Sequence, residues 1–238
     1  MPFDAMGFSK KEAPNCDFCP HKKNCLYSLI DKPSQKEWRE MRIANRFRPG
    51  EVIFYEGEQP TGVYVCCAGK VKIYKSSRGG QQLLLRFESP GDLVGHISLL
   101  ANWPYADNAE AMEESVVSMV DEETFRRFLL KHSQAAYSLL REVSKDVRRG
   151  EARARDIAFK PARARLAGTL VRHIPSPTPK NPVVSALKRK DLAEMSGLTI
   201  ETTVRLLKDF ETKGYIRREG KEIALINFEK LRSLAGQD

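Results

Sequence analysis

The sequence predicts an α+β chain that begins with a roll of short antiparallel strands, continues into one long helix and ends in a small helical domain. Three observations indicate this arrangement. Between residues 45 and 120, apolar runs of about five residues recur at short intervals with turn residues between them. A stretch from about 134 to 159 lacks proline and has apolar residues at helical spacing. Two further helical patterns with a glycine between them follow near the C-terminus.

Composition is that of a globular protein with room for more than one domain. The chain has 238 residues, of which 41% are hydrophobic and 8% aromatic. No apolar run approaches the roughly 18 residues that cross a bilayer, and no signal peptide opens the sequence. We therefore expect a cytoplasmic protein with no membrane partner. Because the sequence shows no nucleophile–base set, phosphate-binding glycine loop or paired carboxylates, we do not expect an enzyme.

The charge distribution favours a nucleic-acid partner. The formal net charge is +9, and residues 161–238 hold 15 Lys and Arg against 9 Asp and Glu. Most of the basic excess therefore lies in the C-terminal third. Such an excess suits a polyanion, because neutralising phosphates releases condensed counterions.

The first 30 residues form a polar arm that carries Cys16, Cys19 and Cys25. Five cysteines in a chain without an export signal argue against a disulfide framework and favour thiolates that hold a metal. The arm is too short for a core of its own, so a bound ligand would have to tie it down.

The roll is expected to contain strands at 51–55, 62–65, 70–74 and 83–87, with a closing strand at 115–120. Cys66 and Cys67 follow the second of these strands. Neighbouring strand residues point to opposite faces, so only one of the two thiols would reach a site shared with the arm. Both could instead be small buried hydrophobic residues.

The long helix carries an apolar stripe that fits either a core or a dimer seam. Its members are Ala136, Leu139, Leu140, Val143, Val147, Ala154 and Ile157. A helix alone between two domains has little else to pack against, which favours the seam. Arginines near it could oppose association of the metal-free form by like-charge repulsion. These are Arg148, Arg149, Arg153 and Arg155.

Residues 190–213 read as a helix, a glycine-containing turn and a second helix that begins after Thr199. Glu201 and Arg205 share one face near the start of that second helix, where side chains meet base edges in the major groove. Arginine can donate twice to guanine, and glutamate can accept from cytosine. The alternative is an exposed helix salt bridge of little energetic value.

Threonines could add phosphate contacts to this helix-turn-helix. They are Thr199, Thr202 and Thr203. The following segment, 214–225, reads as a two-stranded wing that turns at Glu219 and Gly220.

With these motifs the chain resembles the Crp/Fnr superfamily of bacterial transcription regulators. The resemblance is carried by Gly57-Glu58, Gly69-Lys70-Val71, residues 90–95, residues 163–167 and the signature at 197–207. It implies a cyclic-nucleotide-binding-type antiparallel β-roll, a long dimerisation helix and a C-terminal winged helix-turn-helix. The implied parts are a sensor arm at 1–30, the roll at 31–132, the helix at 133–160 and the DNA-binding domain at 161–238.

The resemblance also implies partners and residue roles. A homodimer would bind a palindromic double-stranded DNA site and act together with RNA polymerase. Glu201 and Arg205 would read a G·C pair, and Val204 would help set the preceding base, where the oxygen-sensing branch usually has serine. Cyclic nucleotide is not expected, because residues 95–109 contain no arginine and Asp107 would repel phosphate.

The cysteine spacing of the arm resembles that of Fnr-type arms and implies an iron–sulfur cluster, [4Fe–4S], that responds to oxygen or nitric oxide. Four cysteines are the usual ligand count. The Fnr-type fourth cysteine is matched here by Ser118, so Cys67, Cys66 or a carboxylate such as Asp121 would replace it. Cys67 is preferred, because Cys66 matches an apolar family position.

Two alternatives stay open for the sensor. Zinc with His21 as a further ligand competes with the cluster. A regulator with no cluster would respond through thiol redox or a small molecule in the roll.

Overall fold

A computed structural model describes residues 7–77, 79–80, 82–173, 182–184, 187–220 and 222–236. The chain divides into two compact units, one of residues 1–80 and 85–147 and the other of residues 81–84 and 148–238. No helix within these described ranges is long and apolar enough to cross a membrane.

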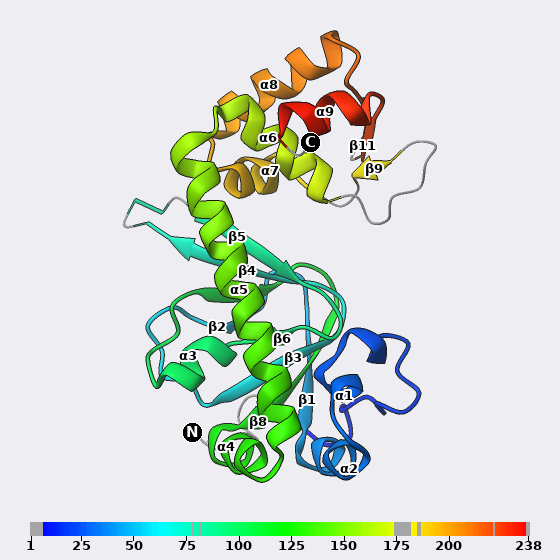
Figure 1. Cartoon of the computed structure of the whole chain (residues 1–238), viewed down its shortest axis with the longest axis vertical. Helices are drawn as coiled ribbons and strands as arrows, with labels where there is room; N and C mark the ends of the chain where they lie inside the picture. The colour runs from blue at the N-terminus through cyan, green and yellow to red at the C-terminus, as the bar shows by residue number, and fades with distance from the viewer. Residues whose placement is uncertain are drawn as a thin grey trace. The chain divides into compact units, whose positions relative to one another are not determined.

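The first unit contains the β-roll, which consists of two four-stranded sheets (Figure 1). One sheet has the order β1 (Ile43–Phe47), β8 (Ser115–Asp121), β3 (Gly62–Ala68) and β6 (Leu93–Val94). The other has the order β2 (Val52–Phe54), β7 (Asn108–Ala111), β4 (Val71–Ser76) and β5 (Gln82–Glu88). The five strands expected from the sequence are therefore confirmed. The short strands β1, β6 and β7 and the helix α3 (His96–Ala101) were not anticipated.

Strand β3 pairs with β8 and contains a bulge where the cysteines lie. Val65 is opposite Ser118 and Cys66 opposite Val117, but the next residue to pair is Ala68. Cys67 is thus the extra residue of a β-bulge. A bulge interrupts the alternation of side chains and can re-aim one of them.

The arm is not a single irregular lead. It has a 3₁₀ turn (Lys22–Asn24) and the helix α1 (Leu26–Leu29), and the helix α2 (Lys32–Met41) follows it. Asp31 caps α2 by accepting hydrogen bonds from the backbone and hydroxyl of Ser34, which satisfies backbone donors that would otherwise be orphaned.

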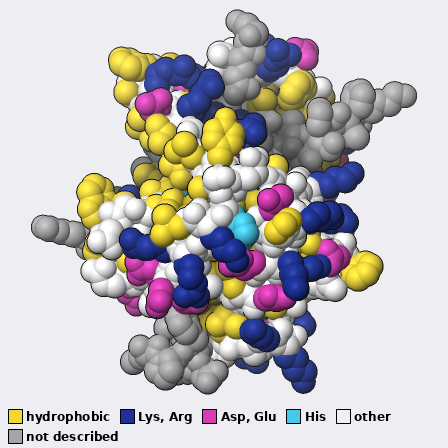
Figure 2. All heavy atoms as spheres, turned by 60° about the horizontal axis from the view of Figure 1, so that its bottom comes forward, with side chains coloured by type: hydrophobic (Ala, Val, Ile, Leu, Met, Phe, Trp, Pro, Cys, Tyr) yellow, Lys and Arg dark blue, Asp and Glu magenta, His cyan; other side chains and the backbone are white. Residues whose placement is uncertain are grey.

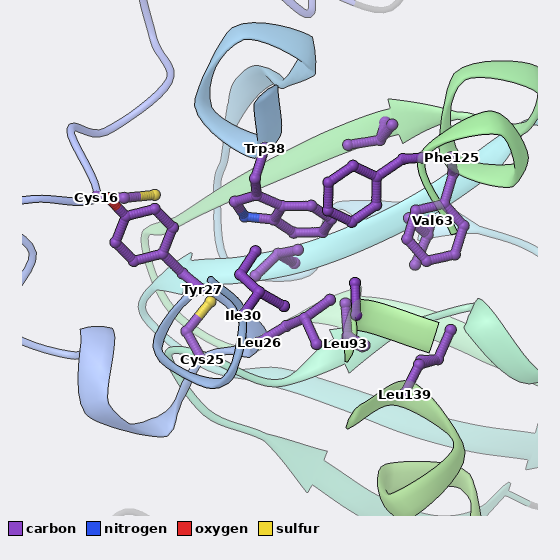
Figure 3. Close-up of a cluster of buried hydrophobic side chains, with 14 of the residues drawn as sticks. Cys16, Cys25, Leu26, Tyr27, Ile30, Trp38, Val63, Leu93, Phe125 and Leu139 are labelled. Atoms are coloured by element: carbon purple, nitrogen blue, oxygen red, sulfur yellow. The ribbon is translucent and has the colours of Figure 1, made fainter. Parts of the chain in front are cut away.

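The arm, α4 (Glu122–Lys131) and the start of α5 (Ser133–Phe159) share one hydrophobic cluster. Trp38 of α2 packs edge-on against Phe125 of α4. Figure 3 shows Cys16 and Cys25 at one edge of this cluster and Leu139 of α5 at another. Buried side chains therefore connect the arm cysteines to the long helix without interruption.

Helix α5 confirms the expected long helix, but the apolar stripe is divided. Leu139 is 2% exposed and belongs to the roll's own core, so the assignment of this residue to a dimer seam was wrong. Leu140 and Val147 are exposed, as is Tyr137, which the predicted stripe did not include. We call these three residues the seam stripe.

The second unit is built from α6 (Ala162–Arg172), α7 (Arg189–Ser196), α8 (Ile200–Thr212) and α9 (Phe228–Leu234). A small sheet with the order β10 (Ile216–Glu219), β11 (Glu222–Leu225) and β9 (Val183–Val184) completes it. Leu166, Leu192, Leu207 and Phe210 are fully buried in its core. The helix pair and the wing hairpin correspond to those expected from the sequence.

Candidate functional site

A cavity in the first unit brings all five cysteines together. It encloses about 340 Å³ of empty space, part of it open to solvent. Cys16, Cys19 and Cys25 line it from the arm, and Cys66 and Cys67 line it from β3. Residues separated by about forty positions in the sequence therefore line one cavity, and both β3 cysteines are among them, although the alternation of side chains along a strand predicted only one.

Polar contacts fix the loop that carries the first two cysteines. Asp17 accepts hydrogen bonds from the Tyr27 hydroxyl and from Arg39. The hydrogen bond from Tyr27 and the Arg39 charge lower the pKa of Asp17, so this carboxylate remains ionised. Lys22 donates to the Asp17 carbonyl oxygen at 2.9 Å. The loop is thereby attached to α1 and α2.

Gly91 lets the arm approach the roll. Its φ is +109°, and a Cβ placed there would lie 2.8 Å from the backbone of Asn24 and 3.1 Å from the nitrogen of Cys25. The Gly91 amide donates to the Cys66 carbonyl at 2.8 Å. A side chain at this position would therefore press against the arm beside Cys25.

Burial favours the protonated thiol at two of the arm cysteines, Cys16 and Cys25. Burial raises the pKa of Cys25 to about 11, and burial also raises that of Cys16, although Arg42 acts in the opposite direction. Metal ligation requires thiolates, so it would release these protons. In the described part of the chain, no three His, Cys, Asp or Glu side chains converge as a group that could hold a metal ion.

The two thiols on β3 have different surroundings. Cys66 is fully buried in the roll's second core cluster, and its sulfur lies 3.6 Å from the Ala68 carbonyl oxygen. Cys67 is partly buried and packs against the cluster that contains Cys16 and Cys25. Its sulfur lies 3.3 Å from the Ser118 hydroxyl. The bulge thus places the Cys67 thiol beside the Ser118 hydroxyl of β8.

Arg42 connects these groups. Its guanidinium donates to Cys16 Sγ at 2.8 Å and to Ser118 Oγ at 3.2 Å, and it lies 3.6 Å from Cys67 Sγ. This residue was not among the candidates that the sequence suggests. A single arginine before a strand carries no signal of its own, because only the fold turns it inward.

The other candidate ligands lie differently. His21 lines the cavity but is exposed. Asp121 caps α4 by accepting from the Thr124 amide at 2.9 Å and does not line the cavity. Its carboxylate already serves the helix end, which makes it a poorer substitute for the fourth cysteine.

Residues 95–109, which we did not expect to bind a nucleotide phosphate, form α3, the following loop and the start of β7. Asp107 lies there 3.6 Å from Lys75. Nearby, Arg86 is paired with the buried Glu88 at 2.5 Å. An anionic phosphate would meet a carboxylate at 107, and the side chain of Arg86 already donates a hydrogen bond to Glu88.

In the second unit, α7 and α8 meet at Gly197. This residue has φ +60° and ends α7, while the Leu198 amide donates back to the Ala193 carbonyl at 2.9 Å. Thr199 caps α8 by accepting from the Thr202 amide at 3.2 Å. The turn is therefore fixed by local hydrogen bonds at both helix ends.

The predicted DNA-contacting residues fall into two groups. Glu201, Arg205, Val204 and Thr199 are exposed, and Thr202 is half-buried. Hydrogen bonds from its own backbone and from Thr199 lower the pKa of Glu201. Within the described ranges neither Glu201 nor Arg205 forms an ion pair, so the salt-bridge alternative is not what the structure shows.

The prediction that Thr203 contacts a DNA phosphate was wrong. The residue is fully buried, and its hydroxyl donates to the Thr199 carbonyl at 3.0 Å. The side chain lies on the core face of α8 and cannot reach a DNA phosphate.

Charged side chains do not separate into large single-sign regions on the surface seen in Figure 2, where Lys and Arg lie among Asp and Glu. The wing shows the same mixing. Arg218 pairs with Glu211, and Arg217 pairs with Glu219 at 2.5 Å. Net charge alone therefore does not identify the DNA-binding surface.

Comparisons with known proteins agree with both units. A cyclic nucleotide-binding domain model matches residues 44–132, and a Crp-like helix-turn-helix domain model matches residues 164–234. The CRP-like cAMP-activated global transcriptional regulator of Mycobacterium tuberculosis is 28% identical over 78% of this chain and 84% of its own length. The transcriptional activator protein FnrA of Stutzerimonas stutzeri is 26% identical over 91% and 93%.

A solved structure supports the same assignment. FixK2 from Bradyrhizobium japonicum superimposes with a TM-score of 0.71 at 25% identity, covering 81% of this chain and 96% of that one. Fold, helix-turn-helix and relatives together define a DNA-binding transcription regulator and not an enzyme. The chain belongs to the Crp/Fnr family.

Proposed function

We propose that this regulator binds palindromic DNA as a homodimer under the control of an iron–sulfur cluster, [4Fe–4S], that is sensitive to oxygen or nitric oxide. The observation that carries the proposal is the cavity lined by all five cysteines. Soft thiolates from two separate segments of the chain are the ligand set that such a cluster requires. The chemistry that this centre supplies is its reactivity toward these two gases.

We assign the four ligands to Cys16, Cys19, Cys25 and Cys67. Cys67 is chosen over Cys66 because its sulfur is beside Ser118, whereas the Cys66 sulfur is sequestered in the other core. Each cysteine binds a different iron, so the four thiols need not converge as they would around one metal ion.

The residues present also fit the charge of a thiolate-ligated cluster. Arg42 is 3% exposed, and its Nε has no hydrogen-bond partner in the described part of the chain. A buried cation among thiols is what an anionic centre needs for neutralisation. Zinc would be held by fewer of these thiols together with His21, and it would bring no inorganic sulfide.

Cyclic nucleotide is not the effector in this proposal. The Mycobacterium tuberculosis relative is named for activation by cAMP, but residues 95–109 of this chain offer no arginine to a phosphate. Asp107 contacts Lys75, and Arg86 contacts Glu88, so these two basic side chains already have carboxyl partners.

Communication with DNA would pass from the arm to α5. The Ser138 hydroxyl donates to the Leu29 carbonyl at 3.3 Å, and Leu139 shares a core with Cys25 and Leu26. The Glu37 carboxylate of α2 lies 2.6 Å from Lys131 Nζ and 2.9 Å from His132 Nε2. These two residues stand at the junction between α4 and α5. Ligation of the arm cysteines would therefore stabilise the first turns of α5.

Helix α5 would pair with its copy through the seam stripe. A dimer would place two α8 helices about 34 Å apart, one helical turn of DNA. Glu201 and Arg205 would then read a G·C pair in each half-site, Val204 would face the preceding base, and Thr199 and Thr202 would contact phosphates. RNA polymerase would be the partner of the DNA-bound dimer.

The test is DNA affinity measured by fluorescence anisotropy on a palindromic duplex. Protein purified and kept without oxygen is compared with the same sample after exposure to air. We expect air to weaken binding by a factor in the range of about 5 to 150, the usual range of coupling between two sites. Equal affinities before and after air would contradict control by a cluster.

A further inference from the structure

We propose that Arg42 is a positioning residue of the cysteine cavity, whose guanidinium supplies the positive charge that balances an anionic, thiolate-ligated centre. This inference rests on the proposed function and concerns a residue outside the ligand set. It predicts that Arg42 governs the retention and the reduction potential of the centre.

The surroundings of Arg42 carry the inference. The side chain is 3% exposed and lines the cavity. It reaches Cys16 Sγ at 2.8 Å, the Pro14 carbonyl at 3.0 Å and Ser118 Oγ at 3.2 Å, with Cys67 Sγ at 3.6 Å. All four partners are neutral when the thiols are protonated.

A buried charge of this kind normally has a carboxylate partner. No Asp or Glu forms an ion pair with Arg42 among the residues that the structure describes, and its Nε is unpartnered. Burying a guanidinium without a counter-charge is costly, and this cost is recovered when an anion binds beside it. The groups within reach that can become anionic are thiols.

Other basic side chains do not meet this requirement. Lys22 also lines the cavity, but it is exposed and donates to the Asp17 carbonyl. Arg39 is partly exposed and is matched by Asp17. Among the described residues that line the cavity, Arg42 is the basic side chain that is buried and has no carboxylate as an ion-pair partner.

The position of Arg42 in the chain also matters. It stands between the end of α2 and the start of β1, so its backbone is held by both elements. Its contacts join the arm, through Pro14 and Cys16, to the roll, through Cys67 and Ser118. One cation therefore touches a thiol from each of the two segments that supply the proposed ligands.

A positive charge beside a redox centre favours the form with more electrons. Net charge and hydrogen bonds to sulfur are among the factors that set the reduction potential of an iron–sulfur cluster. Removing Arg42 should therefore lower that potential and weaken retention of the centre. Lysine at the same position should preserve most of the effect, because it keeps the charge.

The experiment compares Arg42→Met and Arg42→Lys with Arg46→Met, which removes an exposed arginine four residues away that pairs with Glu12. Each protein is reconstituted without oxygen with iron and sulfide and then titrated with redox dyes of known potential. Iron and sulfide content and the urea midpoint of the metal-free protein are measured in parallel.

Support would be a lower potential, or loss of most of the iron and sulfide, in Arg42→Met only. Its metal-free form should be as resistant to urea as Arg46→Met, since the change removes an unpaired buried charge. An unchanged potential with full iron and sulfide would overturn the inference, as would a metal-free Arg42→Met protein that fails to fold, because the arginine would then be structural. If the wild-type protein binds no iron and sulfide, the proposed function is wrong, and the inference about Arg42 is wrong as well.

Discussion

The sulfur of Cys67 lies 3.3 Å from the hydroxyl of Ser118 on the neighbouring strand. Ser118 occupies the position at which an Fnr-type chain would carry its fourth cysteine, and the β3 bulge brings Cys67 next to it. A thiol missing from β8 is thus available from β3. In the proposed site, β3 therefore supplies the fourth ligand in place of β8.

The first prediction concerns Cys67 as the proposed fourth ligand. Cys67→Ser should lose most of its iron and sulfide after anoxic reconstitution, because three thiolates then remain. Cys66→Ser should retain both, since the Cys66 thiol lies in the other core. The double variant Cys67→Ser with Ser118→Cys should recover the centre, because it returns the thiol to the adjacent position. Visible absorption and sulfide analysis measure all three, and loss in Cys66→Ser with retention in Cys67→Ser would reverse the assignment.

A second prediction tests the contact between roll and arm. Gly91→Ala should weaken retention of the centre without changing any cysteine, because the new Cβ would press on the backbone of Asn24. Gly57→Ala is the matched control. Its φ of +90° imposes a similar backbone strain of about 1–2 kcal/mol, but nothing lies within 4 Å of the added carbon. Equal loss of iron and sulfide in both variants would show that strain, and not the arm contact, is responsible.

For DNA, we expect Arg205→Ala to weaken binding to the palindromic site by about 1–3 kcal/mol and to relax the preference for the G·C pair. Lys208→Ala removes the same charge from an exposed position on α8 and should weaken binding to specific and random duplexes alike. Anisotropy titrations on matched, G·C-substituted and random duplexes distinguish the two effects. If Arg205→Ala keeps the wild-type preference, the base-reading role is wrong.

Stability should depend on pH through Glu88. Burial raises its pKa to about 7, against the opposing Arg86 charge and with Asp92 and Asp146 adding to the rise. The folded protein then binds this proton more tightly than the unfolded chain, whose glutamates titrate near about 4.3. This stabilising contribution is fully present below about pH 4.3 and is lost as the pH rises toward 7, by at most about 4 kcal/mol.

Urea unfolding at intervals between about pH 4.5 and 8 measures this slope. Glu88→Gln should flatten it, whereas Glu113→Gln, on an exposed turn, should leave it as in the wild type. An identical slope in Glu88→Gln would mean that other groups account for it.

The seam stripe gives a prediction about assembly. Leu140→Asp should shift the protein toward the monomer, because Leu140 is 60% exposed in one chain and would be buried against a partner's α5. Arg141→Asp, on an exposed neighbouring position outside the stripe, should leave the dimer intact. Sedimentation at several concentrations reports both. A dimer of unchanged stability in Leu140→Asp would place the interface elsewhere.

Local patterns in the sequence predicted part of the fold. Five strands of the roll, helix α5 and the turn at Gly197 follow from apolar periodicity and from glycine and threonine at helix ends. The cysteine triplet was visible because its spacing is local. These features depend on neighbours in the chain, which a sequence displays directly.

What the sequence did not predict depends on tertiary contacts. The bulge at Cys67 exists only in the pairing of β3 with β8, and Arg42 is inside the cavity only because α2 and β1 turn it there. Thr203 and Leu139 were assigned to exposed surfaces, but packing turns them into the core. Helical spacing identifies a face and does not say which neighbour will cover it.

The most direct test of the central claim is the iron and acid-labile sulfide content of wild-type protein purified without oxygen. We predict about four of each per chain, a visible absorption band that fades in air, and loss of both elements in Cys67→Ser. Colourless protein, or one zinc per chain without sulfide, would contradict the claim that these cysteines hold an iron–sulfur cluster.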